Sequence, residues 1–386
     1  MDPSFPPPPG FQGSSSQSTR HGHTAGCGLI PGSTEEGPRR SRIGSSRDSL
    51  WNRRRIGLLL LGVLVLPWLP ILRPPSDAAP TKRARGAGDV LTRAVAFAPD
   101  GEAIATLHTD GRVALRDAAG GEGSLTFLGY RGYARAMAFS PDGRFLAVGG
   151  IAPDILLYDP RAGGAGHPLG MPIREPNILV FSPDGRTLAA SSFHHHEILL
   201  WDLVAGREQA RLRGHESPVI SLAFAPDGQS LASGGMSDQA ILLWDLATGR
   251  PRRRLEVPRG TVKSLTYSPD GALLASTGHP ERPVRLWDLK AGRLDRLIGS
   301  HSHEKNSVAF SPDGRLLATA GDDGIVRLWS VATGAELRHV GSSDERLVGV
   351  AFSPAGKMLA ATGYDTDIRL WELADLFGAG PDASSE

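Results

Sequence analysis

The chain has 386 residues, of which 40% are hydrophobic and 22% charged, so it holds enough apolar material for one large folded domain. The formal net charge is +1, but residues 1–55 carry +4 and the residues after position 80 carry −3. A weakly acidic domain lacks the positive surface needed for nucleic-acid binding, so we expect no nucleic-acid partner. The single cysteine, Cys27, excludes a disulfide within the chain.

The first 55 residues are rich in Pro, Ser and Arg and poor in apolar side chains. A segment of this composition cannot bury enough apolar surface to offset the entropy that it loses on folding. Residues 1–55 are therefore predicted to form a disordered tail. The 48 glycines and 30 prolines of the whole chain favour a fold with many tight turns.

An uncharged run of 17 residues follows at 56–72, with the sequence IGLLLLGVLVLPWLPIL. As a helix it would reach about 25 Å, the short end of a membrane span. Three arginines at 53–55 precede it, which places the tail in the cytoplasm by the positive-inside rule. The run predicts a single-pass signal anchor in the lipid bilayer, with the following domain outside the cytoplasm. A cleaved signal peptide and a buried core helix are the alternatives. Residues 73–80 are Pro-rich and predict a short linker.

Residues 81–372 repeat one pattern seven times, and its clearest copy runs from Asn306 to Trp329. An anchoring aromatic residue recurs every 42 or 43 residues, at Phe97, Phe139, Phe181, Phe224, Tyr267, Phe310 and Phe352. A closing residue recurs at the same interval, at Arg116, Tyr158, Trp201, Trp244, Trp287, Trp329 and Trp371. A fixed period in the low forties with several short strands per repeat predicts a β-propeller.

Each anchoring aromatic leads into a turn with the sequence Ser-Pro-Asp-Gly or a close variant. Pro fixes φ at the first central residue, Asp hydrogen-bonds back to the backbone, and Gly accepts a positive φ. The seventh turn has Ala355 in place of Asp, so it loses the side-chain hydrogen bond. In the clearest copy the pattern predicts strands at 307–310, 316–319, 325–329 and 336–340.

The repeats resemble those of WD-repeat (tryptophan–aspartate repeat) β-propellers. Trp-Asp itself stands at 201–202, 244–245 and 287–288, with near matches at 158–159, 329–330 and 371–372. The resemblance covers about three quarters of the chain. It implies an all-β fold, a seven-bladed propeller of four-stranded antiparallel blades, preceded in this chain by the disordered tail and one transmembrane helix.

The resemblance also implies a hydrogen-bond chain of His, Ser or Thr, Asp and Trp inside a blade. Two repeats hold the full set, and these residues are His215, Ser233, Asp238 and Trp244, and His301, Thr319, Asp323 and Trp329. A buried indole N–H or imidazole without a partner lowers stability. The first three repeats lack parts of the set, with Arg116, Ala152 and His195 at its positions, and we expect those blades to be softer.

A propeller has to close, because its end sheets otherwise expose their edges. Residues 81–86 precede Phe97 much as 208–214 precede Phe224, and we predict that they supply the outer strand of the last blade. Residues 373–386 soon turn small and polar, and we predict a disordered tail there.

Motifs for catalysis are missing from the sequence, which contains no GxxxxGK[ST], HExxH or GxSxG. We therefore expect neither an enzyme nor a cofactor. The run His194-His195-His196-Glu197 is the one cluster of metal-ligand types, but alternate strand residues share a face, so at most His194 and His196 face one ion. A metal or small-molecule site at this turn or in the central channel is the alternative function.

Propellers of the resembled family usually dock peptides or protein domains on the face around the central channel. The residues at matching positions are Arg93, Tyr133, Arg135, Asn177, His194, Lys263, Asn306, Arg346 and Tyr364. Arg, Tyr and Asn are common in protein interfaces. The sequence thus predicts a non-catalytic, membrane-tethered scaffold that docks a protein or peptide partner on this face.

Overall fold

The structure is a computed structural model. It describes residues 82–84, 91–118, 124–127, 130, 132–152, 154–258, 260–280, 283–299, 305–341, 346–365 and 368–377. The predicted tail at 1–55, the apolar run at 56–72 and the linker at 73–80 lie outside the described residues.

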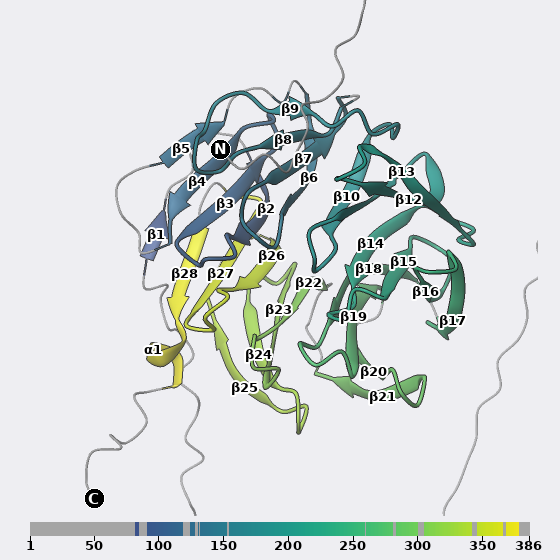
Figure 1. The fold of residues 1–386 in the computed structure, drawn as a ribbon. Helices are drawn as coiled ribbons and strands as arrows, with labels where there is room; N and C mark the ends of the chain where they lie inside the picture. Colours follow the sequence, from purple (N-terminus) through teal and green to yellow (C-terminus); the bar gives the residue numbers. More distant parts are fainter. Residues whose placement is uncertain are drawn as a thin grey trace, which may run out of the picture. The chain divides into compact units, whose positions relative to one another are not determined.

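Seven four-stranded antiparallel sheets stand around a common axis, each forming one blade (Figure 1). Six blades use four consecutive strands each, and we number them 1 to 6 in chain order. From the innermost strand to the outermost, blade 1 consists of β2 (Thr92–Phe97), β3 (Ala103–His108), β4 (Val113–Asp117) and β5 (Ser124–Phe127); blade 2 of β6 (Ala134–Phe139), β7 (Leu146–Gly150), β8 (Leu156–Tyr158) and β9 (His167–Pro168); and blade 3 of β10 (Pro176–Phe181), β11 (Thr187–Ser192), β12 (His195–Asp202) and β13 (Arg207–Arg213). Blade 4 consists of β14 (Val219–Phe224), β15 (Ser230–Gly235), β16 (Ala240–Asp245) and β17 (Arg250–Glu256); blade 5 of β18 (Thr261–Tyr267), β19 (Leu273–His279), β20 (Val284–Asp288) and β21 (Arg293–Ile298); and blade 6 of β22 (Lys305–Phe310), β23 (Leu316–Gly321), β24 (Val326–Ser330) and β25 (Glu336–Val340). The predicted seven-bladed all-β propeller is confirmed.

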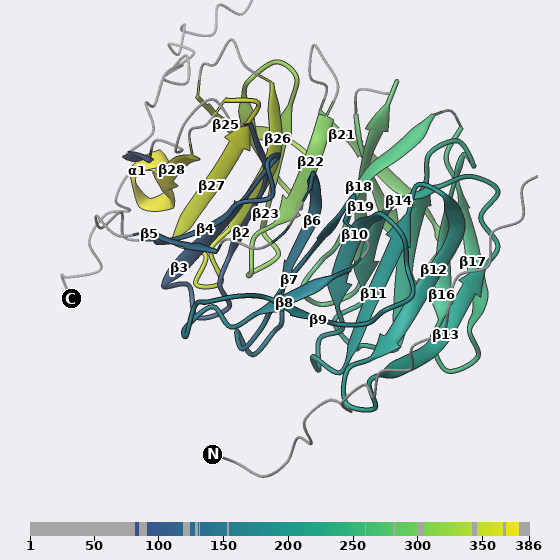
Figure 2. The ribbon, with the colours of Figure 1, turned by 90° about the horizontal axis from the view of Figure 1, so that it is seen from above.

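The seventh blade is completed by a strand from the other end of the domain. It consists of β26 (Leu347–Phe352), β27 (Met358–Gly363), β28 (Ile368–Glu372) and β1 (Lys82–Ala84). β1 runs antiparallel to β28, with Lys82 opposite Leu370 and Ala84 opposite Ile368, and the two strands lie next to each other in Figure 1. Figure 2 shows β26, β27 and β28 of the same blade from above. The predicted closure by the segment 81–86 is thus confirmed for its described residues 82–84, and the pairing removes the open edge of β28.

The turn between the first and second strand of each blade is built by its own side chains. In blade 2, Ser140 Oγ donates to Asp142 Oδ1 at 2.6 Å and accepts the Phe145 N–H at 2.9 Å. The same Asp142 oxygen accepts the Arg144 N–H at 3.0 Å, and Gly143 adopts φ 69°. This φ lies in the left-handed region, which explains the glycine. Blades 3, 5 and 6 repeat these bonds from Ser182, Ser268 and Ser311.

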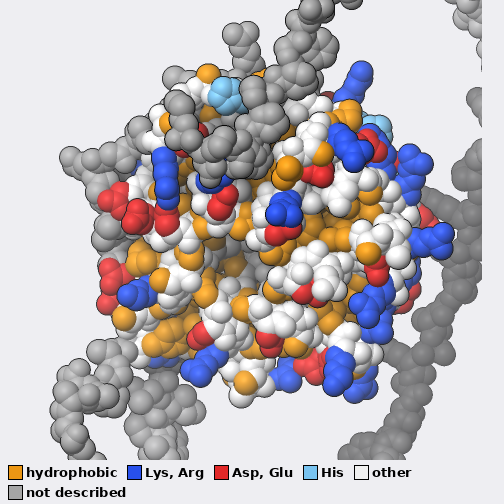
Figure 3. All heavy atoms as spheres, in the orientation of Figure 1, with side chains coloured by type: hydrophobic (Ala, Val, Ile, Leu, Met, Phe, Trp, Pro, Cys, Tyr) orange, Lys and Arg blue, Asp and Glu red, His pale blue; other side chains and the backbone are white. Residues whose placement is uncertain are grey.

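The core lies mainly between adjacent blades, because each sheet buries both of its faces. Between blades 3 and 4, for example, Leu200 and Leu212 pack in one cluster with Leu222 and Trp244. Successive side chains of a strand point to opposite faces of the sheet, so neighbouring residues pack against the blade before and the blade after. Charged side chains of both signs lie round the rim in Figure 3, and hydrophobic atoms are exposed nearer its centre.

A short helix, α1 (Leu373–Phe377), follows directly after β28. Its Leu373 and Leu376 are buried in the cluster between blades 6 and 7. Arg338 of β25 donates from Nε to the Leu376 carbonyl at 2.9 Å, and its guanidinium lies 5.9 Å from the centre of the Phe377 ring. The segment 373–386, expected to be a disordered tail, therefore begins with a packed helix, and residues 378–386 lie outside the described residues.

The prediction of a transmembrane helix, and of a single-pass membrane localisation, is corrected by the structure. None of the helices within the described residues is long and apolar enough to cross a membrane. In this part of the chain the helix is α1, whose five residues span about 7.5 Å, against about 30 Å for the hydrocarbon core of a bilayer. The run at 56–72 that suggested the anchor lies outside the described residues.

Candidate functional site

The innermost strand of every blade has a β-bulge at the same position, four residues before the anchoring aromatic. At this residue the pairing between the first and second strands loses register in all seven sheets. A bulge leaves one residue unpaired and redirects its side chain. The seven bulge residues are Arg93, Arg135, Asn177, Ile220, Lys263, Asn306 and Val348.

All seven bulge residues line one cavity of about 570 Å³. Because they come from the innermost strands of all seven blades, this cavity is the mouth of the central channel. Large nonpolar side chains make up half of the remaining lining, and these are Leu91, Met137, Ile178, Leu179, Phe193 and Met236. We call the bulge residues and this lining the channel face.

On one side of the channel face, two arginines lie against aromatic rings. The Arg93 guanidinium is 5.7 Å from the centre of the Tyr133 ring, and that of Arg135 is 5.1 Å from the Phe193 ring. Arg135 also donates to Glu175 Oε2 at 3.2 Å. The flat rings and the carboxylate therefore hold the two cations in defined places.

On the other side, a hydrogen-bond network crosses three blades. Lys263 Nζ donates to Asn306 Oδ1 at 3.1 Å, and Asn306 Nδ2 donates to Asp322 Oδ1 at 2.7 Å and to the Leu347 carbonyl at 2.8 Å. Arg346 Nη1 lies 3.7 Å from Asp322 Oδ2. Lys263, Asn306 and Arg346 thus link blades 5, 6 and 7, and Lys263 and Asn306 also face the channel.

Six of the nine sequence-predicted partner-binding residues line the channel cavity, namely Arg93, Arg135, Asn177, Lys263, Asn306 and Tyr364. Tyr133 is exposed beside Arg93, and Arg346 is exposed beside Asp322. His194 lies elsewhere, in a smaller cavity of about 360 Å³ with the rest of the His194–Glu197 turn. The structure therefore brings most of the predicted set to one place, and His194 lines a different cavity but is linked to Arg135 through Glu175.

The His194–Glu197 turn is arranged for ion pairing. His194 Nε2 lies 3.1 Å from Glu175 Oε2, while Glu197 accepts hydrogen bonds from Arg211 at 2.5 Å and Arg213 at 3.0 Å. Burial alone would raise the pKa of Glu197, but the bonds from the two arginines outweigh it and lower that pKa. Among the described residues no group of three or more His, Cys, Asp or Glu side chains is placed to hold a metal.

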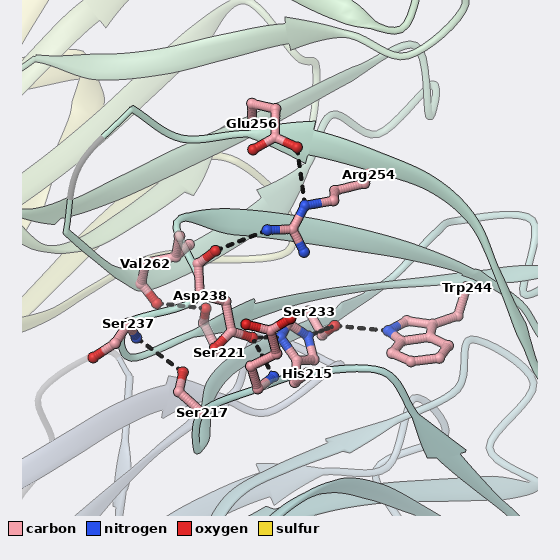
Figure 4. Close-up of polar contacts among 11 residues, drawn as sticks. His215, Ser217, Ser221, Ser233, Ser237, Asp238, Trp244, Arg254, Glu256 and Val262 are labelled. Carbon is pink, nitrogen blue, oxygen red and sulfur yellow. Dashed lines mark hydrogen bonds and ion pairs between the residues drawn. The ribbon is translucent and has the colours of Figure 1, made fainter.

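The first predicted hydrogen-bond chain lies in the core of blade 4 (Figure 4). Trp244 Nε1–H donates to Ser233 Oγ at 2.7 Å, and Ser233 meets His215 Nε2 at 2.5 Å. His215 Nδ1 contacts the Asp238 carboxylate. Burial lowers the pKa of His215, and Asp238 offsets this only in part. The neutral ring then donates from Nδ1 to Asp238 and accepts from Ser233 at Nε2, which satisfies each donor in turn.

The second predicted chain is described in part. Trp329 Nε1 donates to Thr319 Oγ1 at 2.9 Å, and Asp323 accepts a hydrogen bond from Arg327 at 2.6 Å. His301 lies outside the described residues. Blade 7 repeats the Asp–Arg pair with Asp365 and Arg369.

Comparison with known families agrees with this geometry. A family model described as the IFT122 first beta-propeller matches residues 176–376, more than half of the chain. A model of the WD domain, G-beta repeat, matches residues 122–159. The chain belongs to the WD-repeat β-propeller family. This fold is typical of protein-interaction scaffolds, and WD-repeat propellers are generally non-catalytic. No curated protein matches the chain.

Sequence reasoning missed eight residues of the channel face of this WD-repeat propeller. Ile220 and Val348 are bulge residues, and the other six are the nonpolar lining residues Leu91, Met137, Ile178, Leu179, Phe193 and Met236. Aliphatic side chains at these positions carry no interface signal of the kind that Arg, Tyr and Asn carry. The constant offset of four residues before each anchoring aromatic was the signal that would have found Ile220 and Val348.

Proposed function

We propose that this WD-repeat propeller is a non-catalytic scaffold that docks a protein segment on its channel face. The observation that carries the proposal is the convergence of all seven bulge residues on one cavity. Bulges that redirect side chains are common beside functional sites. A cavity of about 570 Å³ is large enough to receive several side chains of a partner.

Exposed apolar side chains support the same face. Nine large hydrophobic side chains are exposed among the described residues, and five of them belong to this region. Leu91, Met236 and Tyr364 line the cavity, while Tyr133 and Ile151 are joined at its edge by a backbone hydrogen bond of 2.9 Å. Apolar side chains gathered on one face mark an interaction surface more often than scattered ones do.

The network between blades 5 and 7 supports docking in a further way. Lys263 and Asn306 are held by hydrogen bonds before any partner arrives, so little side-chain entropy is lost on binding. Lys263 and Arg346 are poor positions for a charge-reversal test, because each substitution would also disturb a contact between neighbouring blades. Arg93 makes no ion pair among the described residues, and it is the better probe.

The test is a comparative capture from a cell extract with the full chain as bait. Three baits are compared: the wild type, Arg93→Glu, and Arg252→Glu on the exposed outer strand β17 as the charge-matched control. We expect a protein that binds the wild type and the control and is lost with Arg93→Glu, and whose purified form shows the same order of affinities. Equal capture by all three baits, or capture of nothing, would rule out the channel face as the docking site.

A further inference from the structure

The charged side chains that line the channel cavity share one sign. Arg93, Arg135 and Lys263 are the charged residues among its described lining, and no Asp or Glu belongs to that lining. The domain as a whole is weakly acidic, so this concentration of cations does not follow from composition.

The carboxylates near the channel face are already engaged. Glu175 contacts Arg135 and His194, and Asp322 accepts from Asn306 and lies near Arg346. Asp365 pairs with Arg369. These groups therefore offer little free negative charge to a cationic partner.

Arg93 is the cation with unused capacity. Its contact in the structure is the face of the Tyr133 ring, which leaves the five N–H donors of the guanidinium available. A guanidinium beside an apolar lining binds a carboxylate well, since the pair is charge-assisted and can be bidentate.

We propose that the channel face selects an extended protein segment in which an Asp or Glu stands beside an apolar side chain. The carboxylate is received by Arg93, and the apolar side chain enters the lining formed by Met137, Ile220 and Val348. This inference rests on the proposed docking function and adds the chemistry of the partner to it.

Glu175 acts in this proposal as an internal competitor for the second arginine. It adopts φ 48°, which is rare for a residue other than glycine and is further disfavoured before a proline, here Pro176. Its carboxylate lies 3.2 Å from Arg135 and 3.1 Å from His194. Strained backbone of this kind tends to occur at binding sites. Replacing the carboxylate by an amide removes the negative charge paired with Arg135, which makes Arg135 more available to an acidic partner.

The experiment selects random 12-residue peptides displayed on phage against the full chain. We expect the selected peptides to carry Asp or Glu next to an apolar residue. Their affinities are then measured with synthetic peptides and five proteins: the wild type, Arg93→Gln, Glu175→Gln, Val348→Phe, and Arg252→Gln as the matched control. Val348→Phe fills the cavity without changing its charge.

Arg93→Gln is expected to weaken binding about 10-fold or more, because it removes a charge-assisted hydrogen bond to the peptide carboxylate. Changing the peptide Asp to Asn has the same effect, and the two changes together cost no more than either alone. Glu175→Gln tightens binding several-fold, and Arg252→Gln leaves it unchanged.

The failure of this inference can be told apart from failure of the proposed function. Peptides that are lost with Val348→Phe but keep their affinity for Arg93→Gln, or that lack acidic residues, overturn the inference and leave channel-face docking intact. Peptides that bind all five proteins equally, or a selection that yields no binder, overturn both.

Discussion

Ser233 Oγ lies between two ring nitrogens, accepting the Trp244 indole N–H at 2.7 Å and meeting His215 Nε2 at 2.5 Å. Its position, nine residues after the anchoring aromatic, decides whether the tryptophan of a blade is satisfied. Ser276 and Thr319 occupy it in blades 5 and 6, and each accepts its indole N–H at 2.9 Å.

Where that position is alanine, the indole N–H lacks this hydroxyl acceptor. Ala190 and Ala361 occupy it in blades 3 and 7. The indole nitrogens of Trp201 and Trp371 have no hydrogen-bond partner among the described residues. The strand pairing around the tryptophan is otherwise the same, because Leu359 pairs with Trp371 in blade 7 as Leu231 pairs with Trp244 in blade 4.

Replacing Ser233 by Ala is expected to destabilise the protein by about 1–3 kcal/mol, the usual cost of leaving buried polar groups unsatisfied. Both the Trp244 N–H and His215 Nε2 lose their partner. Urea unfolding followed by tryptophan fluorescence measures the change. Ser233→Thr keeps the hydroxyl and serves as the control, with most of the stability retained. A Ser233→Ala protein as stable as the wild type would show that the chain contributes nothing.

Replacing Ala361 by Ser is expected to stabilise the protein, by about 0.5–1.5 kcal/mol, because the new hydroxyl accepts the Trp371 N–H. The position is fully buried, as Ser233 is in blade 4. Thermal unfolding of the variant beside the wild type gives the sign. Ala361→Val, which adds volume without an acceptor, should not stabilise. Equal gains from both variants would point to packing instead of hydrogen bonding.

The free energy of unfolding is expected to decrease as the pH is lowered below about 6.5. The reason is that burial lowers the pKa of His215 from about 6.5, its ordinary value. Between the lowered pKa and about 6.5 the unfolded chain binds a proton that the native protein does not, so the free energy of unfolding decreases as pH drops. The slope from this group is at most about 1.4 kcal/mol per pH unit.

An NMR titration of the His215 ring tests this directly, and His215→Gln should flatten the pH dependence of urea unfolding over the same range. A ring that becomes protonated above pH 6.5 would reverse the sign. The turn aspartates act in a separate window. Hydrogen bonds from the turn serine and the backbone lower the pKa of Asp184, Asp270 and Asp313, so their contribution is lost only as pH falls below about 4.

Replacing Ala355 by Asp is expected to stabilise the seventh turn by about 0.5–1 kcal/mol. In that turn Ser353 Oγ accepts the Met358 N–H at 3.0 Å, but the aspartate present in blade 2 is missing. The new carboxylate would accept from Ser353 and from the Lys357 N–H. Thermal unfolding of Ala355→Asp is compared with Ser353→Ala/Ala355→Asp, in which the gain should shrink. A gain independent of Ser353 would assign it to surface charge.

The repeat spacing predicted the fold, because an aromatic anchor and a Ser-Pro-Asp-Gly turn fix both ends of a hairpin locally. The channel-face bulges were not predictable in the same way, since a bulge is a property of strand pairing. The Asp323–Arg327 pair was missed because sequence reasoning assigned that carboxylate to the His chain alone. The helix Leu373–Phe377 was missed because five residues carry little helical signal, and Arg338 and the core between blades 6 and 7 hold it in place.

The pairing of β1 with β28 also sets the order of events during synthesis. Lys82 leaves the ribosome about 290 residues before its partner Leu370. At about 5–20 residues per second, β1 waits roughly 15 to 60 s for the strand that it joins. All strands of blades 1 to 6 have been synthesised before then, whereas blade 7 lacks β28 until the last part of the domain is made. Until the two meet, both strands present free edges to other nascent chains, so the closing pair is the point at which misassembly between molecules is easiest.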